Sequence, residues 1–279
     1  NSKGSTMKLL SSAKINLNLK ISSANIGNLH ELISDIIPID IFDEIEIVEN
    51  RNNIIEYDKE ELNTIHTTVH KAFELIEKFN PSFDKKFKIN ISKNIPIEAG
   101  LGGSSSNAGT VISYLCKEYE LNVPSNTEIA HFIGSDVPFF VYGSAAKVEG
   151  IGERITPLSG LPGMDLLVAV PKFGLSTKEV FNQYDKLSEV DTSKDQWNQI
   201  DIFNDLFNAA AHLRPEIIDI KNHLETELNQ KFYMSGSGSS LFAILDDEAI
   251  HNELDSENFN LQSMYITKKI DCSFSQNDD

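Results

Sequence analysis

The sequence predicts an α+β fold, and two features of its hydrophobic pattern lead to that class. Apolar and polar residues alternate with period two over residues 13–21, as they do in a half-buried strand, whereas apolar residues within 64–79 recur on one helical stripe. Strand and helix patterns follow one another without the regular rhythm of a doubly wound parallel sheet. The chain has 279 residues, of which 40% are hydrophobic, which suits roughly two domains with ordinary cores.

Each further element is predicted from its own periodicity and from the turn residues around it. Strands are expected at residues 36–41, 44–48, 86–92, 145–148, 165–170 and 241–245. Helices are expected at residues 107–120, 127–132, 177–184, 204–211 and 216–230. Two prolines and two glycines in residues 156–163 mark the predicted boundary between one domain over 7–157 and a second over 158–279.

The formal net charge of −18 excludes two classes of partner. Nucleic acids and anionic membranes both require a basic face, so we expect neither to bind. No apolar run approaches the length of a membrane span and no signal peptide opens the chain, so we expect a cytoplasmic protein. No obligate protein partner is evident. We expect residues 1–6 to be an expression remnant, and Cys116 and Cys272, which lack a paired spacing, to be free thiols.

Residues 96–106, Pro-Ile-Glu-Ala-Gly-Leu-Gly-Gly-Ser-Ser-Ser, form a glycine-rich loop between a predicted strand and a predicted helix. Gly100, Gly102 and Gly103 let backbone N–H groups converge on an anion, and the following helix directs its positive end toward the same point. The loop lacks the lysine of a Walker A motif and does not fit G-x-G-x-x-G. A nucleoside triphosphate is the expected ligand, and a surface turn is the alternative.

Other residues could carry chemistry beside that loop. Lys14 interrupts an apolar strand, so it lies either on a solvated face or in a functional site. Asp136 lies in a tight, otherwise apolar turn, where it either caps the turn or acts as a functional carboxylate. A second glycine turn at residues 234–240 supplies either phosphate donors or a tight connection to the next strand. His66 and His70 have the i,i+4 spacing of metal ligands, but no third ligand is apparent.

Taken together, the motifs resemble one family over residues 7–245. They are A-K-I-N-L at 13–17, H-E-L at 30–32, P-x-x-A-G-L-G-G-S-S-S-N-A at 96–108, G-S-D-V-P-F-F at 134–140, G-I-G-E at 150–153, S-T at 176–177, N-D-L at 204–206 and M-S-G-S-G-S at 234–239. The set resembles the GHMP small-molecule kinase superfamily. The first, fourth and fifth motifs narrow the resemblance to its kinases of a cytidine diphospho-alcohol.

The resemblance implies an N-terminal α/β nucleotide-binding domain, a C-terminal ferredoxin-like domain and an active site in the cleft between them. It implies ATP as co-substrate with Mg²⁺, whose protein ligand the sequence does not assign, and catalytic roles for Lys14 and Asp136. The expected ATP-binding residues are Pro96, Gly100, Leu101, Gly102, Gly103, Ser104, Ser105 and Ser106. A second loop near the phosphates comprises Ser235, Gly236, Ser237 and Gly238. The expected acceptor-binding residues are Asn16, His30, Thr177 and Phe181.

The implied reaction is transfer of the ATP γ-phosphoryl group to the 2-hydroxyl of a cytidine-diphosphate-linked methylerythritol, a step of non-mevalonate isoprenoid synthesis. The chain departs from the family pattern at Leu29, where the family places an aromatic residue on the cytosine ring, and at Ser104 and Ser135, where Gly and Ala are customary. Two alternatives remain: a homoserine or mevalonate kinase of the same superfamily, and a non-catalytic nucleotide sensor. The presence of both Lys14 and Asp136 argues against the sensor, because binding alone requires neither.

Overall fold

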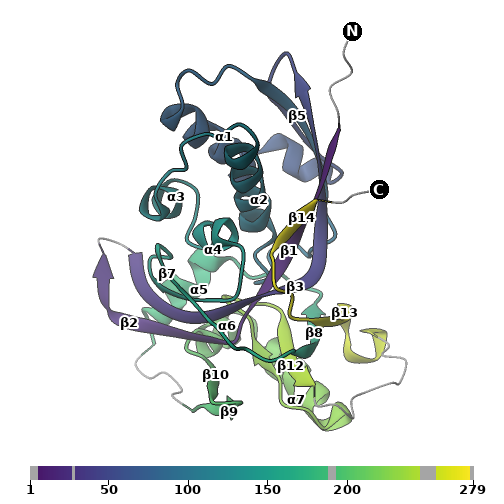
Figure 1. Ribbon diagram of the computed structural model, residues 1–279. Helices are drawn as coiled ribbons and strands as arrows, with labels where there is room; N and C mark the ends of the chain where they lie inside the picture. Colours follow the sequence, from purple (N-terminus) through teal and green to yellow (C-terminus); the bar gives the residue numbers. More distant parts are fainter. Residues whose placement is uncertain (1–5, 27–28, 188–192, 246–255, 277–279) are drawn as a thin grey trace.

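The computed structural model describes residues 6–26, 29–187, 193–245 and 256–276, and it confirms the α+β class. Two sheets organise this part of the chain (Figure 1). The large sheet contains β1 (Met7–Asn16), β2 (Asn18–Ile26), β3 (Leu29–Asn50), β4 (Ile54–Tyr57), β5 (Lys86–Ser92), β6 (Ala146–Gly150), β7 (Arg154–Pro157), β9 (Asp195–Trp197), β10 (Ile200–Asn204) and β14 (Phe274–Gln276). The small sheet has the order β11 (Tyr233–Met234), β12 (Leu241–Leu245), β8 (Asp165–Pro171) and β13 (Leu261–Lys268).

The central element of the large sheet is β3, a curved strand of 22 residues (Figure 1). It pairs antiparallel with β1, β2, β5 and β6 along different parts of its length. The sequence predicts two separate strands here, at 36–41 and 44–48, with a break at residues 42 and 43. A register shift opposite Ser12 and Ala13 absorbs extra residues of β3, so the strand continues through the interruption.

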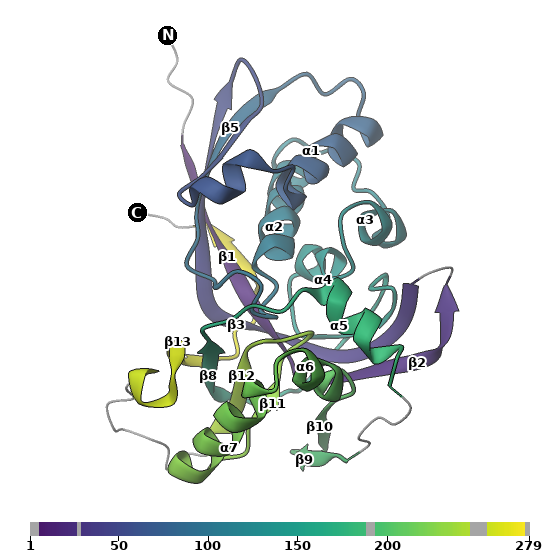
Figure 2. The same cartoon turned by 180° about the vertical axis from the view of Figure 1, so that it is seen from behind.

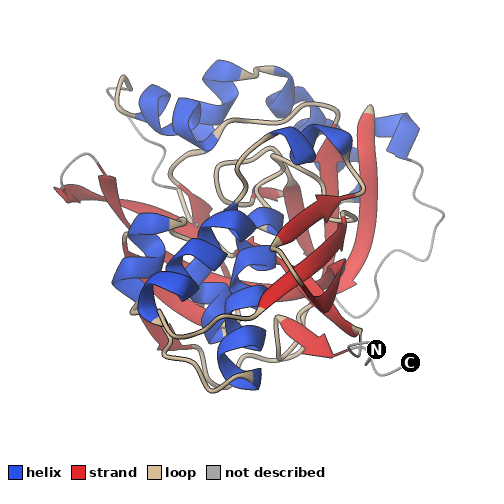
Figure 3. Cartoon of the chain, turned by 90° about the horizontal axis from the view of Figure 1, so that it is seen from above, coloured by secondary structure: helices blue, strands red, loops and turns tan. Residues whose placement is uncertain are grey.

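Separate groups of helices cover the two sheets (Figure 3). The helices are α1 (Thr68–Phe79), α2 (Gly103–Glu118), α3 (Asn126–Phe132), α4 (Val137–Tyr142), α5 (Thr177–Tyr184), α6 (Phe207–Leu213) and α7 (Glu216–Leu228), with short 3₁₀ turns at Glu60–Thr64 and Ser256–Phe259. One core packs α1 and α2 on β3 and β5, and a second packs α6 and α7 on the small sheet (Figure 2). A third core, which includes Ile15, Ile39 and Val168, joins the two sheets.

Several predicted boundaries were wrong. The strand expected at 13–21 breaks at Leu17 into β1 and β2, and the helix expected from residue 64 begins at Thr68. The helix expected from residue 107 begins at Gly103, and the loop expected at 134–140 contains α4. Asn204, expected to open a helix, ends β10, and that helix starts at Phe207.

The predicted domain boundary falls between β7 and β8, which belong to different sheets. Strands β9, β10 and β14 lie after the boundary in sequence and nevertheless join the large sheet. The division at residues 157 and 158 therefore stays a prediction. Among the described helices, none has the length and apolar character needed to cross a membrane.

Candidate active site

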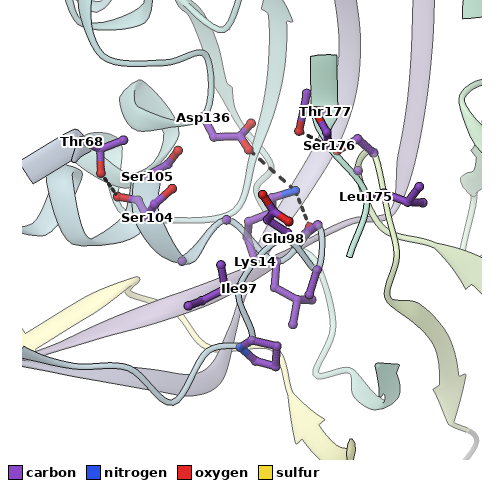
Figure 4. Close-up of a pocket in the computed structure, with 18 of the residues that line it drawn as sticks. Lys14, Thr68, Ile97, Glu98, Ser104, Ser105, Asp136, Leu175, Ser176 and Thr177 are labelled. Carbon is purple, nitrogen blue, oxygen red and sulfur yellow. Dashed lines mark hydrogen bonds and ion pairs between the residues drawn. The ribbon is translucent and has the colours of Figure 1, made fainter. Parts of the chain in front are cut away.

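A cavity of about 630 Å³ lies where the glycine-rich loop meets β1 and the start of α4. Its wall is completed by the start of α5 and by the second glycine loop (Figure 4). Lys14 and Asn16 come from β1, Asp136 from the residue before α4, and Thr177 and Phe181 from α5. Segments that are far apart in the sequence therefore contribute side chains to one cavity.

Lys14 is buried beside the carboxylate of Asp136. Lys14 is 2% exposed, and its Nζ lies 3.8 Å from Oδ2 of Asp136 (Figure 4). The same nitrogen donates a hydrogen bond of 2.9 Å to the Gly100 carbonyl and another to Oδ1 of Asn16. Burial lowers the pKa of Lys14, and the Asp136 carboxylate opposes part of that shift. One ammonium group thus links the glycine loop, the strand and the carboxylate.

The backbone around Asp136 explains its position. Asp136 precedes α4, and the next residues of that helix, from Val137 to Phe140, are buried against the core. Pro138 is tolerated because N–H groups in the first turn of a helix have no intrahelical acceptor, so the missing N–H of proline costs no hydrogen bond there. Gly143 ends the helix with φ +85°. The Asp136 side chain is 34% exposed and faces the cavity (Figure 4).

The glycine-rich loop ends in the first turn of α2. Gly102 is the residue before the helix and has φ +74° and ψ 17°, a conformation that favours glycine. A Cβ on Gly102 would also lie 3.0 Å from Cγ of Lys14, so the loop packs closely on the Lys14 side chain. The first N–H groups of α2 have no partners within the helix and lie at the positive end of its dipole. This geometry suits a bound phosphate.

The two glycine loops touch each other through their backbones. A Cβ on Gly100 would lie 2.3 Å from the carbonyl oxygen of Ser235, so only glycine fits there. The Ser235 hydroxyl donates to the Gly100 carbonyl at 3.1 Å and accepts from the Asn16 backbone at 3.2 Å. The contact holds the second loop against both the first loop and β1.

A buried polar network centred on Asp43 holds both ends of the glycine loop. The Asp43 carboxylate, which is 0% exposed, forms an ion pair with Lys93 and accepts hydrogen bonds of 2.8 Å from the backbones of Asn94 and Ile95. It also accepts from the Asn107 side chain of α2 at 2.9 Å. These contacts tie β3 to both ends of the loop. Lys93 also lines the cavity, although no periodicity or motif in the sequence pointed to it.

The acceptor residues expected from the sequence lie at the α5 side of the cavity. The Thr177 and Ser237 hydroxyls lie 2.8 Å apart, which joins α5 to the second glycine loop. The His30 ring does not line the cavity but stacks on the Phe181 ring, with centroids 5.4 Å apart, and its Nε2 lies 3.0 Å from Oδ1 of Asp185. The side chain of Leu29 lies outside the described residues.

Most of the expected nucleotide residues line the cavity, and two serines do not. The lining members are Pro96, Gly100, Leu101, Gly102, Gly103, Ser104, Ser105, Gly236, Ser237 and Gly238. Ser106 is fully buried and its hydroxyl lies 2.7 Å from that of Ser11, whereas Ser235 is buried in the loop contact described above. Their roles as nucleotide ligands stay predictions.

The far end of the cavity is formed by residues that the sequence analysis did not assign to ATP, among them Leu62, Ile65, Thr68 and Ile97. Ile65 and Ile97 are 56% and 45% exposed, so they present apolar surface to the cavity. The Thr68 hydroxyl, at the start of α1, donates to the Ser104 carbonyl at 2.7 Å (Figure 4). Exposed isoleucines are common on protein surfaces, so no sequence signal marks them.

His66 and His70 make contacts that do not involve a metal. His66 precedes α1 and its Nε2 lies 3.0 Å from Oε1 of Glu74. His70 Nδ1 accepts a hydrogen bond of 3.2 Å from the backbone of Thr67 and so caps α1, while burial lowers the pKa of His70. No group of three potential metal ligands from His, Cys, Asp and Glu occurs within the described ranges.

Comparison with known proteins gives the family. Residues 67–144 match the family described as GHMP kinases N terminal domain. The chain is 34% identical over 252 residues to the 4-diphosphocytidyl-2-C-methyl-D-erythritol kinase of Sulfurihydrogenibium sp., a match covering 85% of this chain and 90% of the relative. It is 32% identical over 259 residues to the enzyme of that name from Clostridium botulinum strain Eklund 17B, covering 86% and 91%.

Solved structures agree. The crystal structure of a 4-(cytidine 5'-diphospho)-2C-methyl-D-erythritol kinase matches with a TM-score of 0.75 and 25% identity, covering 94% of this chain and 99% of that one. A homoserine kinase from Cytophaga hutchinsonii matches with a TM-score of 0.67 and 13% identity, covering 99% of both chains, and shares the fold alone. The chain therefore belongs to the 4-diphosphocytidyl-2-C-methyl-D-erythritol kinase family of the GHMP kinase superfamily.

Proposed function

We propose that this chain transfers the γ-phosphoryl group of ATP to the 2-hydroxyl of 4-diphosphocytidyl-2-C-methyl-D-erythritol, giving the 2-phosphate and ADP. The observation that carries the proposal is the Lys14–Asp136 pair, separated by 3.8 Å. The pair lies in the wall of a cavity that the phosphate-binding loop and α5 also line. The relatives named above act, by their names, on this same alcohol.

Asp136 is the group that accepts the hydroxyl proton in this mechanism. The acceptor oxygen forms a bond to the γ-phosphorus while the bond from that phosphorus to the β–γ bridging oxygen breaks, and ADP leaves with that electron pair. The proton moves to Asp136. Lys14, whose Nζ lies 3.8 Å from the Asp136 carboxylate, offsets negative charge as it develops on the transferred group.

The backbone of the glycine loop holds the phosphates. The protein carries a net charge of −18, so its overall field repels an anionic substrate, and local donors must supply the attraction. The first N–H groups of α2 provide such donors, and the ammonium group of Lys14 lies against the same loop. The exposed Ile65 and Ile97 side chains provide an apolar wall for the adenine ring.

The cavity wall fits a Mg²⁺ ion that is bound mainly through phosphate. Asp136 and Glu98 are carboxylates among the described lining residues, and Ser104 and Ser105 bring hydroxyl groups. Mg²⁺ commonly uses one or two carboxylates together with substrate phosphates and water, so these residues would hold it. When bound, the ion neutralises charge on the β- and γ-phosphates.

Asn16, Thr177, Phe181 and His30 form the acceptor end of the site in this proposal. Asn16 donates from Nδ2 to Ser34 at 2.8 Å and accepts from Lys14, so its amide is fixed in one orientation beside the reacting groups. The Phe181 ring lines the cavity and stacks on His30, so it offers an aromatic surface on which a cytosine ring can rest.

An acceptor panel tests the proposal. The purified protein is assayed for ADP release with ATP and each of three alcohols: the cytidine diphospho-alcohol, homoserine and mevalonate. We expect turnover with the first alone. Turnover with either of the others instead would favour a different kinase of the superfamily, and nucleotide binding without turnover on any alcohol would favour the sensor.

Asp136→Asn then tests the assigned base. We expect kcat to fall by about 10²–10⁴ while the Kd for ADP stays within twofold, because the carboxylate is needed for proton transfer rather than for nucleotide binding. Asp271→Asn, at a carboxylate that is 99% exposed, is the matched control. A kcat within threefold of the parent would remove Asp136 from its role.

A further inference from the structure

The turn at residues 150–153, Gly-Ile-Gly-Glu, lies directly behind the peptide that leads into Asp136. A Cβ on Gly152 would lie 1.9 Å from the carbonyl oxygen of Ser135 and 2.9 Å from the Ser135 Cα. No side chain fits at that distance, so any other residue must displace either the turn or the Ser135 backbone. Gly152 also has φ +105°, a conformation that L-residues rarely adopt.

The turn is held in place from several directions. The Glu153 side chain folds back and accepts a hydrogen bond of 2.7 Å from the backbone of Ile151. The Glu153 carbonyl accepts from the Asn126 side chain of α3 at 3.1 Å. A Cβ on Gly150 would lie 2.4 Å from Oε1 of Glu153, so the glutamate occupies the space that a side chain at Gly150 would need. The turn is therefore less able to move than an ordinary hairpin loop.

Strand β6, which leads into the turn, belongs to the same sheet as β1, the strand that carries Lys14. Gly150 and Ala146 of β6 pair with Leu32 and Ile36 of β3. Ile36 in turn pairs with Asn16 of β1, two residues from Lys14. Hydrogen-bonded backbone thus runs from the lysine across β3 and β6 to the turn, and the turn contacts the peptide before Asp136.

We infer that Gly152 is a positioning residue for catalysis: its bare Cα lets the 150–153 turn press against Ser135 and set the distance between Asp136 and Lys14. This inference rests on the proposed role of Asp136 as proton acceptor. Proton transfer and in-line attack are sensitive to small displacements, since an error of about 1 Å can cost on the order of 10² in rate. The three heavy atoms nearest to a Cβ on Gly152 all belong to Ser135 rather than to the phosphate loop, so nucleotide binding is not expected to depend on this glycine.

Comparing Gly152→Ala with Gly160→Ala tests the inference. Both glycines have positive φ, +105° and +78°, but a Cβ on Gly160 meets nothing within 4 Å. The control therefore carries the backbone strain without the collision. We expect Gly152→Ala to lower kcat by about 10², with the Kd for ADP within twofold of the parent, and Gly160→Ala to leave both within twofold.

A second variant covers the case in which Gly152→Ala fails to fold. Glu153→Ala introduces no collision but removes the hydrogen bond to Ile151, and we expect it to lower kcat by about tenfold with ADP affinity unchanged. The inference is overturned if kcat stays within threefold in every folded variant, or if kcat and ADP affinity fall together. Asp136→Asn separates the two proposals. If that variant keeps its turnover, the assigned role of Asp136 fails and this inference fails with it, whereas the proposed function fails only if the parent protein does not turn over the cytidine diphospho-alcohol in the acceptor panel. If Asp136→Asn is inactive while Gly152→Ala is fully active, only this inference fails.

Discussion

Asp43→Asn removes the charge of a buried ion pair while changing the side-chain volume very little. Asp43 and Lys93 have side chains that are 0% and 4% exposed, so the lysine left behind has little access to water. Breaking one side of a buried pair typically costs about 3–5 kcal/mol, because the remaining charge stays desolvated. The hydrogen bonds from Asn94 and Ile95 also weaken when their acceptor becomes neutral.

The expected loss is a large share of the stability of the protein. Domains of ordinary size unfold with about 5–15 kcal/mol, so the variant should fold but with a reduced margin. For a chain of 279 residues with an unfolding entropy of about 2.1 cal/mol/K per residue, the same loss corresponds to a decrease in Tm of roughly 5–9 °C. Thermal and urea unfolding, followed by circular dichroism, measure both quantities.

Two further variants identify the cause. Asp43→Asn combined with Lys93→Met removes both charges, so we expect this double variant to be more stable than Asp43→Asn alone. Asp271→Asn breaks the ion pair between Asp271 and Lys269. The Asp271 side chain is 99% exposed, so we expect no measurable change in Tm. The reasoning is refuted if Asp43→Asn loses less than about 1 kcal/mol, or if the double variant is no more stable than the single one.

Two other predictions concern the cavity itself. The pKa of Lys14 is lowered, so we expect kcat to fall with rising pH around a midpoint below pH 10.5, where the ammonium group loses its proton. Lys14→Arg, which stays charged, should lack this alkaline decrease whatever its maximal rate. In that pH range the unfolded state binds more protons at Lys14 than the folded state does, so the contribution of Lys14 to the free energy of unfolding increases as pH rises. An unfolding midpoint that drops in parallel with kcat would contradict the assignment of the kcat decrease to Lys14. Gly102→Val should raise the Kd for ATP and also lower kcat, since its side chain would meet Lys14 and Phe140 at 3.0 Å; calorimetric titration of a folded variant with unchanged ATP affinity would show that the loop does not bind phosphate.

Three elements were predicted from the sequence with the bounds that the structure has. These are β5 (Lys86–Ser92), α5 (Thr177–Tyr184) and β12 (Leu241–Leu245). In β5 buried residues alternate with more exposed ones, as its apolar period predicts, whereas β12 is a continuous apolar run whose first three residues are all buried. In both strands the local pattern agrees with the tertiary environment.

Two elements at the candidate site, α2 and α4, were predicted less well than α5, for a physical reason. α2 begins with glycine and serines, and α4 begins with valine and proline, residues that usually indicate loops. The first turn of a helix accepts them, because its N–H groups have no intrahelical partner and serine and proline suit those positions. A binding site built on helix starts therefore looks like a loop in the sequence.

Distances between remote residues were not predictable from local pattern at all. The motifs and the family resemblance singled out Lys14 and Asp136, but no spacing rule connects two residues so far apart. Asp43 and Lys93 had neither a motif nor a resemblance to mark them. Their pairing depends on β3 continuing through a register shift, which the polar sequence around Asp43 conceals.

The length of β3 also limits how the enzyme can change shape. The strand holds His30 near its start and Asp43 beneath the nucleotide loop, and the intervening chain measures roughly 40 Å along its contour at about 3.3 Å per residue. An extended strand that is paired along its length can flex but cannot contract, so β3 fixes the separation of these two ends of the site. Hydrogen exchange should consequently report slow amides along β3 in free and ligand-bound protein alike, with ligand-dependent slowing expected instead at α5 and at the loop at 236–238.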